Sequence, residues 1–219
     1  MLELRCGSGE LTAALSGLGH DVIATDPSAQ LVARLGHTVP NARLAVARPE
    51  DLPFPASSVD IVAAASGDVD AERALPEVAR VLRPGGILAV IRSSGDPKVP
   101  WVRKVLALVG VGSTPAPDNP FESSDLFTLT ERRSFRRWQQ FFRPTLVAFV
   151  ADSPKATMLS QADRADLLDE AGALYDSYGR GPDGLLMPWV VDCYRARVQG
   201  KTGVVTADVT DDGLLIDFF

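Results

Sequence analysis

The chain has 219 residues, of which 46% are hydrophobic and 23% charged, and its formal net charge is −6. This length is enough to bury one large core, and the negative charge argues against a dedicated nucleic-acid binder. No apolar run is long enough to span a membrane. The two cysteines lie far apart in the sequence, and the two histidines have no partner at metal-ligand spacing. We therefore expect a cytoplasmic protein without a disulfide framework, a metal site or a membrane segment.

The hydrophobic pattern predicts strands that alternate with helices along most of the chain. After an apolar strand at the start, we expect strands at 20–24, 42–47, 59–65, 87–91 and 186–198, and helices at 11–18, 28–36, 70–82, 99–109, 144–151 and 161–178. Residues 127–142 alternate charged and aromatic side chains. This order of elements predicts an α/β fold with a doubly wound parallel sheet.

A glycine pair, Gly7 and Gly9, follows the first strand and precedes the first helix, and Asp26 ends the next strand. Glycines let the backbone turn tightly and approach a ligand, and the helix start offers unpaired N–H groups. Asp26 could accept both hydroxyls of a ribose. This context favours a nucleotide-type cofactor at the carboxyl edge of the sheet over an ordinary tight turn.

Five blocks of sequence, in this order and spacing, resemble the class I S-adenosylmethionine-dependent methyltransferases. They are LELRCGSG at 2–9, DPS at 26–28, PEDLPF at 49–54, VDIV at 59–62 and LPEVARVLRPGG at 75–86. The resemblance is to the bacterial small-molecule group, whose core is similar to that of the ubiquinone/menaquinone methyltransferases, and it covers residues 2–197. Dinucleotide-dependent dehydrogenases are the natural rival, but they usually have a third glycine where Thr12 stands.

The resemblance implies a Rossmann-like, seven-stranded sheet whose last strand is antiparallel beside the fifth. It implies S-adenosylmethionine as the cofactor and in-line displacement of its methyl group by a small-molecule acceptor, a reaction that needs no obligatory catalytic side chain. The methionine end would lie over the glycine turn, the ribose at the end of the second strand, the adenine against the loop 48–51, and the reacting methyl after the fourth strand. The residues implied at these places are Cys6, Gly7, Ser8, Gly9, Asp26, Pro27, Glu50, Asp51 and Ser66.

Three departures from the family pattern motivate an alternative function. Arg5 stands where the family has its first glycine, where it would crowd the carboxylate end of the cofactor or pair with that carboxylate. Pro49 lacks the N–H that the family often directs at the adenine. The loop that starts at Ser66 is shorter than in the family. The alternative is therefore a methyltransferase-like protein without catalysis that acts as a binding or assembly module.

Several side chains allow both a structural and a functional interpretation. Asp68 and Asp70 suit a helix N-cap better than a general base, and Cys6 suits a small buried residue better than a reactive thiol. The arginines of 127–142 suit a charged edge strand better than a nucleic-acid stripe. The large aromatic residues are expected mostly in the core, with a substrate pocket as the second reading; they are Trp101, Trp138, Trp189 and Tyr194.

We expect one methyltransferase-like domain over residues 1–198, with a helical insertion at about 143–180 between the sixth and seventh strands. Residues 199–219 form a tail that could add a hairpin. Its end, LLIDFF at 214–219, is unusually apolar, so it is expected to dock on its own domain or to form a homodimer.

Overall fold

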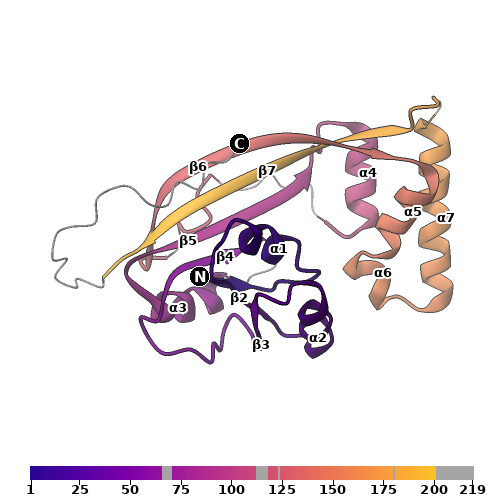
Figure 1. Cartoon of the computed structure of the whole chain (residues 1–219). Helices are drawn as coiled ribbons and strands as arrows, with labels where there is room; N and C mark the ends of the chain where they lie inside the picture. The colour runs from indigo at the N-terminus through magenta and orange to yellow at the C-terminus, as the bar shows by residue number, and fades with distance from the viewer. Residues whose placement is uncertain (66–70, 112–117, 123, 180, 201–219) are drawn as a thin grey trace.

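A computed structural model describes residues 1–65, 71–111, 118–122, 124–179 and 181–200 of the chain. Within them one sheet of seven strands is flanked by helices (Figure 1). The strands are β1 (Leu2–Leu4), β2 (Ile23–Asp26), β3 (Arg43–Val46), β4 (Val59–Ala64), β5 (Leu82–Gly95), β6 (Phe127–Phe141) and β7 (Leu185–Val198). The helices are α1 (Glu10–Gly17), α2 (Ala29–Thr38), α3 (Ala71–Val81), α4 (Pro100–Leu108), α5 (Arg143–Ala151), α6 (Pro154–Met158) and α7 (Gln161–Tyr178).

The order of strands in the sheet is β3-β2-β1-β4-β5-β7-β6. Strands β1 to β5 pair in parallel, and β7 is antiparallel to both β5 and β6. This confirms the predicted doubly wound sheet with its last strand antiparallel beside the fifth. Strand β6 lies at the edge of the sheet, so its arginines lie on an edge strand, where charge opposes pairing with another sheet.

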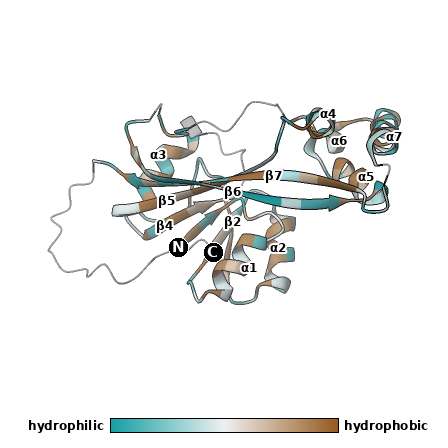
Figure 2. Cartoon of the chain, turned by 90° about the horizontal axis from the view of Figure 1, so that it is seen from above, coloured by the Kyte–Doolittle hydropathy of each residue, from teal (hydrophilic) through white to brown (hydrophobic). Residues whose placement is uncertain are grey.

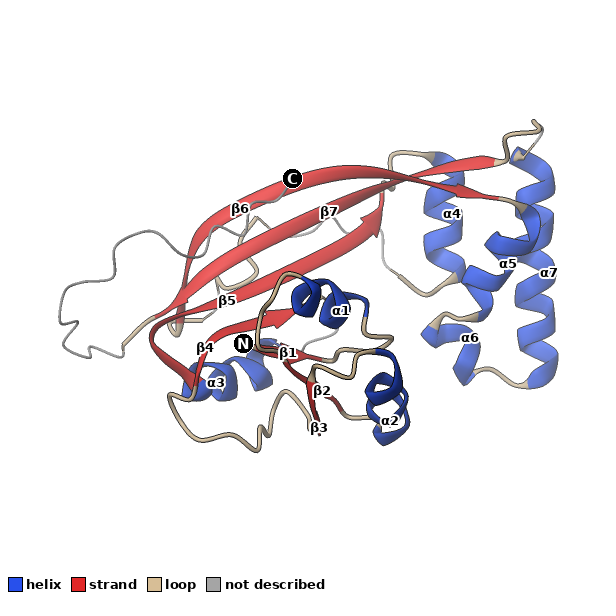
Figure 3. Cartoon of the chain, in the orientation of Figure 1, coloured by secondary structure: helices blue, strands red, loops and turns tan. Residues whose placement is uncertain are grey.

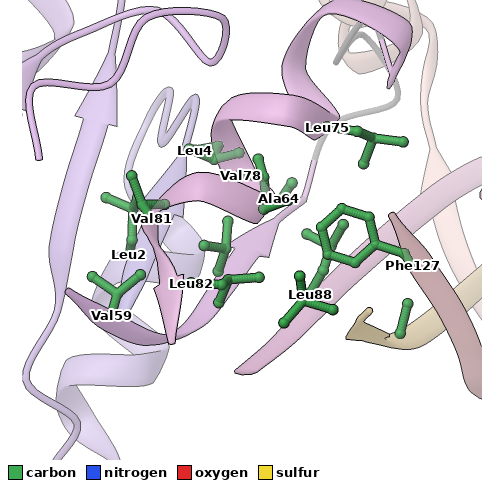
Figure 4. Close-up of a cluster of buried hydrophobic side chains, with 14 of the residues drawn as sticks. Leu2, Leu4, Val59, Ala64, Leu75, Val78, Val81, Leu82, Leu88 and Phe127 are labelled. Atoms are coloured by element: carbon green, nitrogen blue, oxygen red, sulfur yellow. The ribbon is translucent and has the colours of Figure 1, made fainter. Parts of the chain in front are cut away.

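The two faces of the sheet are covered by different helices (Figure 2). The carboxylate of Glu3 in β1 accepts a hydrogen bond from Thr12 of α1. The side chains that point to the same face of the sheet as Glu3 therefore face α1 and α2. The alternate row, with Leu4 and Ala64, packs against Val78 of α3 in the largest apolar cluster (Figure 4). The sheet is therefore buried on both faces at β1 and β4, as the continuous apolar pattern of a parallel strand requires.

Helices α4 to α7 gather at the far end of the long strands β6 and β7 (Figure 3). There they bury a second core that includes Val102 of α4, Leu146 of α5, and Met187 and Trp189 of β7. Helices α5 and α7 match the predicted segments to within a residue, and α6 is an additional helix of five residues. The capping hydroxyl of Ser153 accepts from Ala156 N–H and starts α6, too short for a periodic pattern to predict.

Strand β5 is longer than the predicted 87–91, because it runs from Leu82 to Gly95. The pattern shows only its apolar middle, whereas Arg92 and Ser93 are polar and still pair with β7. The additional residues carry β5 past the end of β4, since Ala64 pairs with Val90. The long β5, β7 and β6 therefore form a wall beyond the carboxyl ends of the shorter strands.

Within the described residues, no helix has both the length and the apolar character that crossing a membrane requires. The predicted C-terminal hairpin and the apolar chain end lie outside the described residues, as do Ser66, Asp68 and Asp70.

Candidate functional site

The predicted site residues come together at the carboxyl edge of the parallel strands. Strand β1 ends at Leu4, which pairs with Thr25 on one side and with Ala64 on the other, so β1, β2 and β4 end level with one another. Asp26 pairs with Val46, the last residue of β3. The edge therefore presents the glycine turn after β1 and the residues that follow β2, which are Cys6, Gly7, Ser8, Gly9, Asp26 and Pro27.

The glycine turn is tight, and its two glycines have different roles. Gly9 N–H donates to the carbonyl of Cys6 at 2.8 Å, and both Gly7 and Gly9 have positive φ, +53° and +85°. A Cβ on Gly9 would lie 2.1 Å from Leu35 Cδ1, so Gly9 is needed for the packing of the turn on α2. A Cβ on Gly7 would meet no protein atom nearer than a carbonyl at 3.9 Å. Gly7 therefore leaves an open approach to the backbone.

The carboxylate of Asp26 links the glycine turn to Ser28, the N-cap residue of α2. Its Oδ2 accepts from Gly7 N–H at 3.1 Å, and its Oδ1 accepts from Ser28 N–H at 2.8 Å. Asp26 is buried, with 6% of its surface exposed. A carboxylate has about four acceptor positions, so these two N–H groups do not use the full acceptor capacity of Asp26.

A cavity of about 320 Å³ lies at the ends of β2 and β3, and Pro27, the residue that follows Asp26, is part of its lining. This volume is at the lower end of the range of about 300–1,000 Å³ that is typical of small-molecule sites. Two of the expected residues, Pro27 and Asp51, line it, whereas Glu50 is half-buried and is not part of the lining. The described residues that line it are Pro27, Val46, Ala47, Arg48, Asp51 and Pro53.

Two residues of α3 hold the loop that forms one side of the cavity. The guanidinium of Arg80 donates to the carbonyls of Leu52 and Phe54, both at 2.8 Å. It also donates twice to the carboxylate of Glu77, at 2.7 Å in each case, and that carboxylate accepts from Leu52 N–H at 3.1 Å. These hydrogen bonds from Arg80 lower the pKa of Glu77. We call Glu77 and Arg80 the loop clamp; the sequence analysis did not assign them a role.

Glu3 is a buried acid beneath the turn, with 1% of its surface exposed, and it too was not predicted as a site residue. Its carboxylate accepts from the hydroxyl of Thr12 at 2.6 Å, and its carbonyl accepts from the hydroxyl of Thr25 at 2.8 Å. Burial raises the pKa of Glu3, and the hydrogen bond from Thr12 partly opposes this. An acid in the middle of an apolar strand was the signal in the sequence that could have identified it.

Cys6 is a buried residue of the turn, and its thiol is not reactive at neutral pH. Burial, together with the negative charges of Glu3 and Asp26, raises the pKa of Cys6 to about 11. The thiolate is the nucleophilic form, so Cys6 acts as a small packing residue, as the sequence analysis favoured. No three histidine, cysteine, aspartate or glutamate side chains gather as a metal site in the described part of the chain.

Arg5 has a backbone conformation that glycine adopts readily. Its φ is +52°, in the left-handed region that side chains with a Cβ rarely adopt, and its side chain is exposed. The turn therefore keeps the path that a glycine would give it, at the cost of strain at this residue.

The sequence is similar to those of methyltransferases over most of its length. A family model described as a methyltransferase domain matches residues 2–90. The uncharacterized methyltransferase Rv3342 of Mycobacterium tuberculosis is 32% identical over 201 residues, which is 90% of this chain and 82% of that protein. The ubiquinone/menaquinone biosynthesis C-methyltransferase UbiE of Shewanella frigidimarina is 36% identical over 118 residues, which is 48% of this chain and 46% of UbiE.

Solved structures share the fold at lower identity. A putative type II methyltransferase from Anaeromyxobacter dehalogenans is 23% identical, with a TM-score of 0.60 over 89% of this chain and 87% of that one. The YcgJ protein of Bacillus subtilis is 17% identical, with a TM-score of 0.62 over 90% of both chains. These likenesses support the fold.

Proposed function

Because the chain belongs to the class I S-adenosylmethionine-dependent methyltransferases, we propose that it binds S-adenosylmethionine at the carboxyl edge of its sheet and methylates a small-molecule acceptor. The observation that carries the placement is the open approach to Gly7, whose N–H is bonded to the carboxylate of Asp26, together with the cavity that begins at Pro27, the next residue after Asp26. Neither the fold nor the comparisons favour the non-catalytic alternative.

The residues present fit such a cofactor. The ribose hydroxyls suit Asp26, whose carboxylate is fixed by two backbone N–H groups and accepts further hydrogen bonds. The cavity beside Pro27 offers a site of suitable size for the adenine, and the loop clamp keeps its far wall in place. The lack of an N–H at Pro49 leaves the other backbone groups of this loop to contact the base. The methionine end then lies over the open side of Gly7.

The protein contributes mainly position to the proposed reaction. When bound, S-adenosylmethionine supplies a sulfonium methyl group that an oxygen, nitrogen or carbon nucleophile can displace. The glycine turn and the carboxylate of Asp26 orient the methyl group toward the methyl acceptor. Holding the reactants in line can account for a large part of the rate gain, and this needs no proton transfer to the cofactor. The thiol of Cys6 takes no part, because it is protonated and buried.

Calorimetric titration with S-adenosylhomocysteine tests the placement without any knowledge of the acceptor. We expect micromolar affinity, about −8 kcal/mol. Val46 is 54% exposed at the rim of the cavity, so V46W should fold, fill the cavity and weaken binding at least tenfold. L18W is the matched control, because Leu18 is 74% exposed at the opposite end of α1.

Two results would contradict the proposal. One is a folded wild-type chain that gives no binding heat, and the other is an equal loss of affinity in V46W and L18W. If S-adenosylhomocysteine binds as expected, release of this product during incubation with S-adenosylmethionine and a panel of small acceptors then measures methyl transfer itself.

A further inference from the structure

On the α1 face of the sheet, apolar side chains extend away from the proposed cofactor site. Strand β5 continues for five residues after Val90, the partner of the last residue of β4, which is about 16 Å of extended chain. Along this stretch, Ile91 of β5, Val191 of β7 and Phe135 of β6 lie on the α1 face, as the strand pairing shows. All three side chains are apolar and half-buried, and we call this set of residues the apolar floor.

Two hydrogen-bond donors without acceptors lie at the far end of the apolar floor. Trp189 pairs with Gly95, the last residue of β5, and with Arg137 of β6. The indole Nε1 of Trp189 is buried and has no hydrogen-bond partner in the described part of the chain. The guanidinium of Arg137 lies 5.1 Å from the centre of the indole ring, and the described residues offer it no hydrogen bond or ion pair.

Arg137 differs from the neighbouring arginines on the same face of the sheet, because those arginines have an acidic partner. Glu131 pairs with Arg133 at 2.6 Å and lies 3.8 Å from Arg195, so these two arginines have an internal counter-ion. Among the described residues no acid pairs with Arg137, and its guanidinium lies over the indole ring instead. The ring itself is held from its edge by Phe149 of α5, with centroids 5.9 Å apart. The aromatic packing therefore fixes the indole while its N–H stays unpaired.

An indole N–H and a guanidinium can only donate; Arg137 is exposed and can donate to water, whereas the buried N–H of Trp189 requires another acceptor. A buried donor without a partner is costly and uncommon in native proteins, and a stacked guanidinium prefers carboxylate or phosphate oxygens. The Arg137–Trp189 pair thus has the chemistry of a site for an anionic oxygen group, and along the strand direction it lies about 16 Å beyond the end of β4.

Resting on the proposed function, we propose that the methyl acceptor is an elongated organic anion. Its carboxylate or phosphate group binds the Arg137–Trp189 pair, its apolar body lies on the floor formed by Ile91, Val191 and Phe135, and its nucleophile reaches the end of β4. The span of the floor excludes acceptors as small as a single amino acid or a short-chain acid.

The indole N–H resonances of the full chain provide a direct test, because the protein has three tryptophans. In a nitrogen-15-labelled sample, W189F identifies the Trp189 signal by its loss and keeps an aromatic ring in the core. Benzoate is the probe for the anion end, and benzamide is its uncharged counterpart. We expect benzoate to move the Trp189 signal in a saturable way and benzamide to leave it in place.

R137M should weaken the benzoate effect at least tenfold. R136M is the matched control: it removes the same charge from the next residue of β6, whose side chain points to the other face of the sheet. R136M should therefore retain the wild-type response. A Trp189 signal that does not move with benzoate, that moves equally with benzamide, or that is affected equally by R136M and R137M would overturn the proposal.

Binding of S-adenosylhomocysteine, measured on the same samples, separates this proposal from the function on which it rests. If the product binds while benzoate has no effect, the anion site is wrong and the cofactor placement stands. If benzoate binds at Trp189 while the product does not bind, the anion site stands and the cofactor placement is wrong.

Discussion

The backbone of Arg5 offers a test of strain within the site. Its φ of +52° is in the left-handed region, where a Cβ costs about 1–2 kcal/mol. Replacing Arg5 by Gly removes this cost, and replacing it by Ala keeps it. Both variants lose every contact of the arginine side chain equally, so their difference isolates the effect of the Cβ at this φ.

The expected difference has a defined sign. At an ordinary position with negative φ, Ala is more stabilising than Gly by about 0.4–1 kcal/mol, because glycine loses more entropy on folding. At Arg5 the strain exceeds this entropy, so R5G should be more stable than R5A by about 0.5–1 kcal/mol. For a chain of this length, that corresponds to about 1–4 °C in Tm.

Urea unfolding of the two variants at the same pH measures this difference directly. An R5A variant that is as stable as R5G, or more stable, would refute the assignment of a strained backbone to this residue. Affinity for S-adenosylhomocysteine provides a second readout: because both variants lack the guanidinium, a change common to both reports whether the side chain crowds the cofactor site or assists binding there.

Two further predictions concern residues that the sequence analysis did not place in the site. The pKa of Glu3 is raised in the folded state, so deprotonation of Glu3 destabilises the fold as the pH rises above the ordinary value of 4.5. E3Q should therefore have a higher Tm than the wild type at pH 8, and this difference in Tm should narrow toward pH 4. A lower Tm for E3Q at pH 8 would contradict this. In the loop clamp, R80M should cost about 1–2 kcal/mol in stability and weaken S-adenosylhomocysteine about tenfold. R83M, which removes an exposed ion pair at 2.5 Å, should change stability by less than about 0.5 kcal/mol, and equal effects of the two would argue against a clamp.

The local sequence determined the order of elements and the parts of the site that depend on neighbouring residues. The glycine turn and the acid that ends β2 are encoded by short-range spacing, because tight turns, helix starts and strand ends each depend on only a few consecutive residues. The alternation of charged and aromatic side chains in β6 is visible in the sequence, but its place at the edge of the sheet followed from the fold that the family resemblance implies. The antiparallel β7 followed from the family resemblance rather than from its own pattern.

The tertiary structure alone decided which distant residues meet. Arg80 reaches carbonyls 26 and 28 residues away, and Glu3 meets a hydroxyl nine residues along the chain, because α3 and α1 pack on the sheet at particular registers. Periodicity indicates which face of an element is apolar, but it does not specify its neighbour or how far a strand continues once its side chains become polar. Arg137 and Trp189 are 52 positions apart in the sequence, and only the register of β6 against β7 brings these two side chains together.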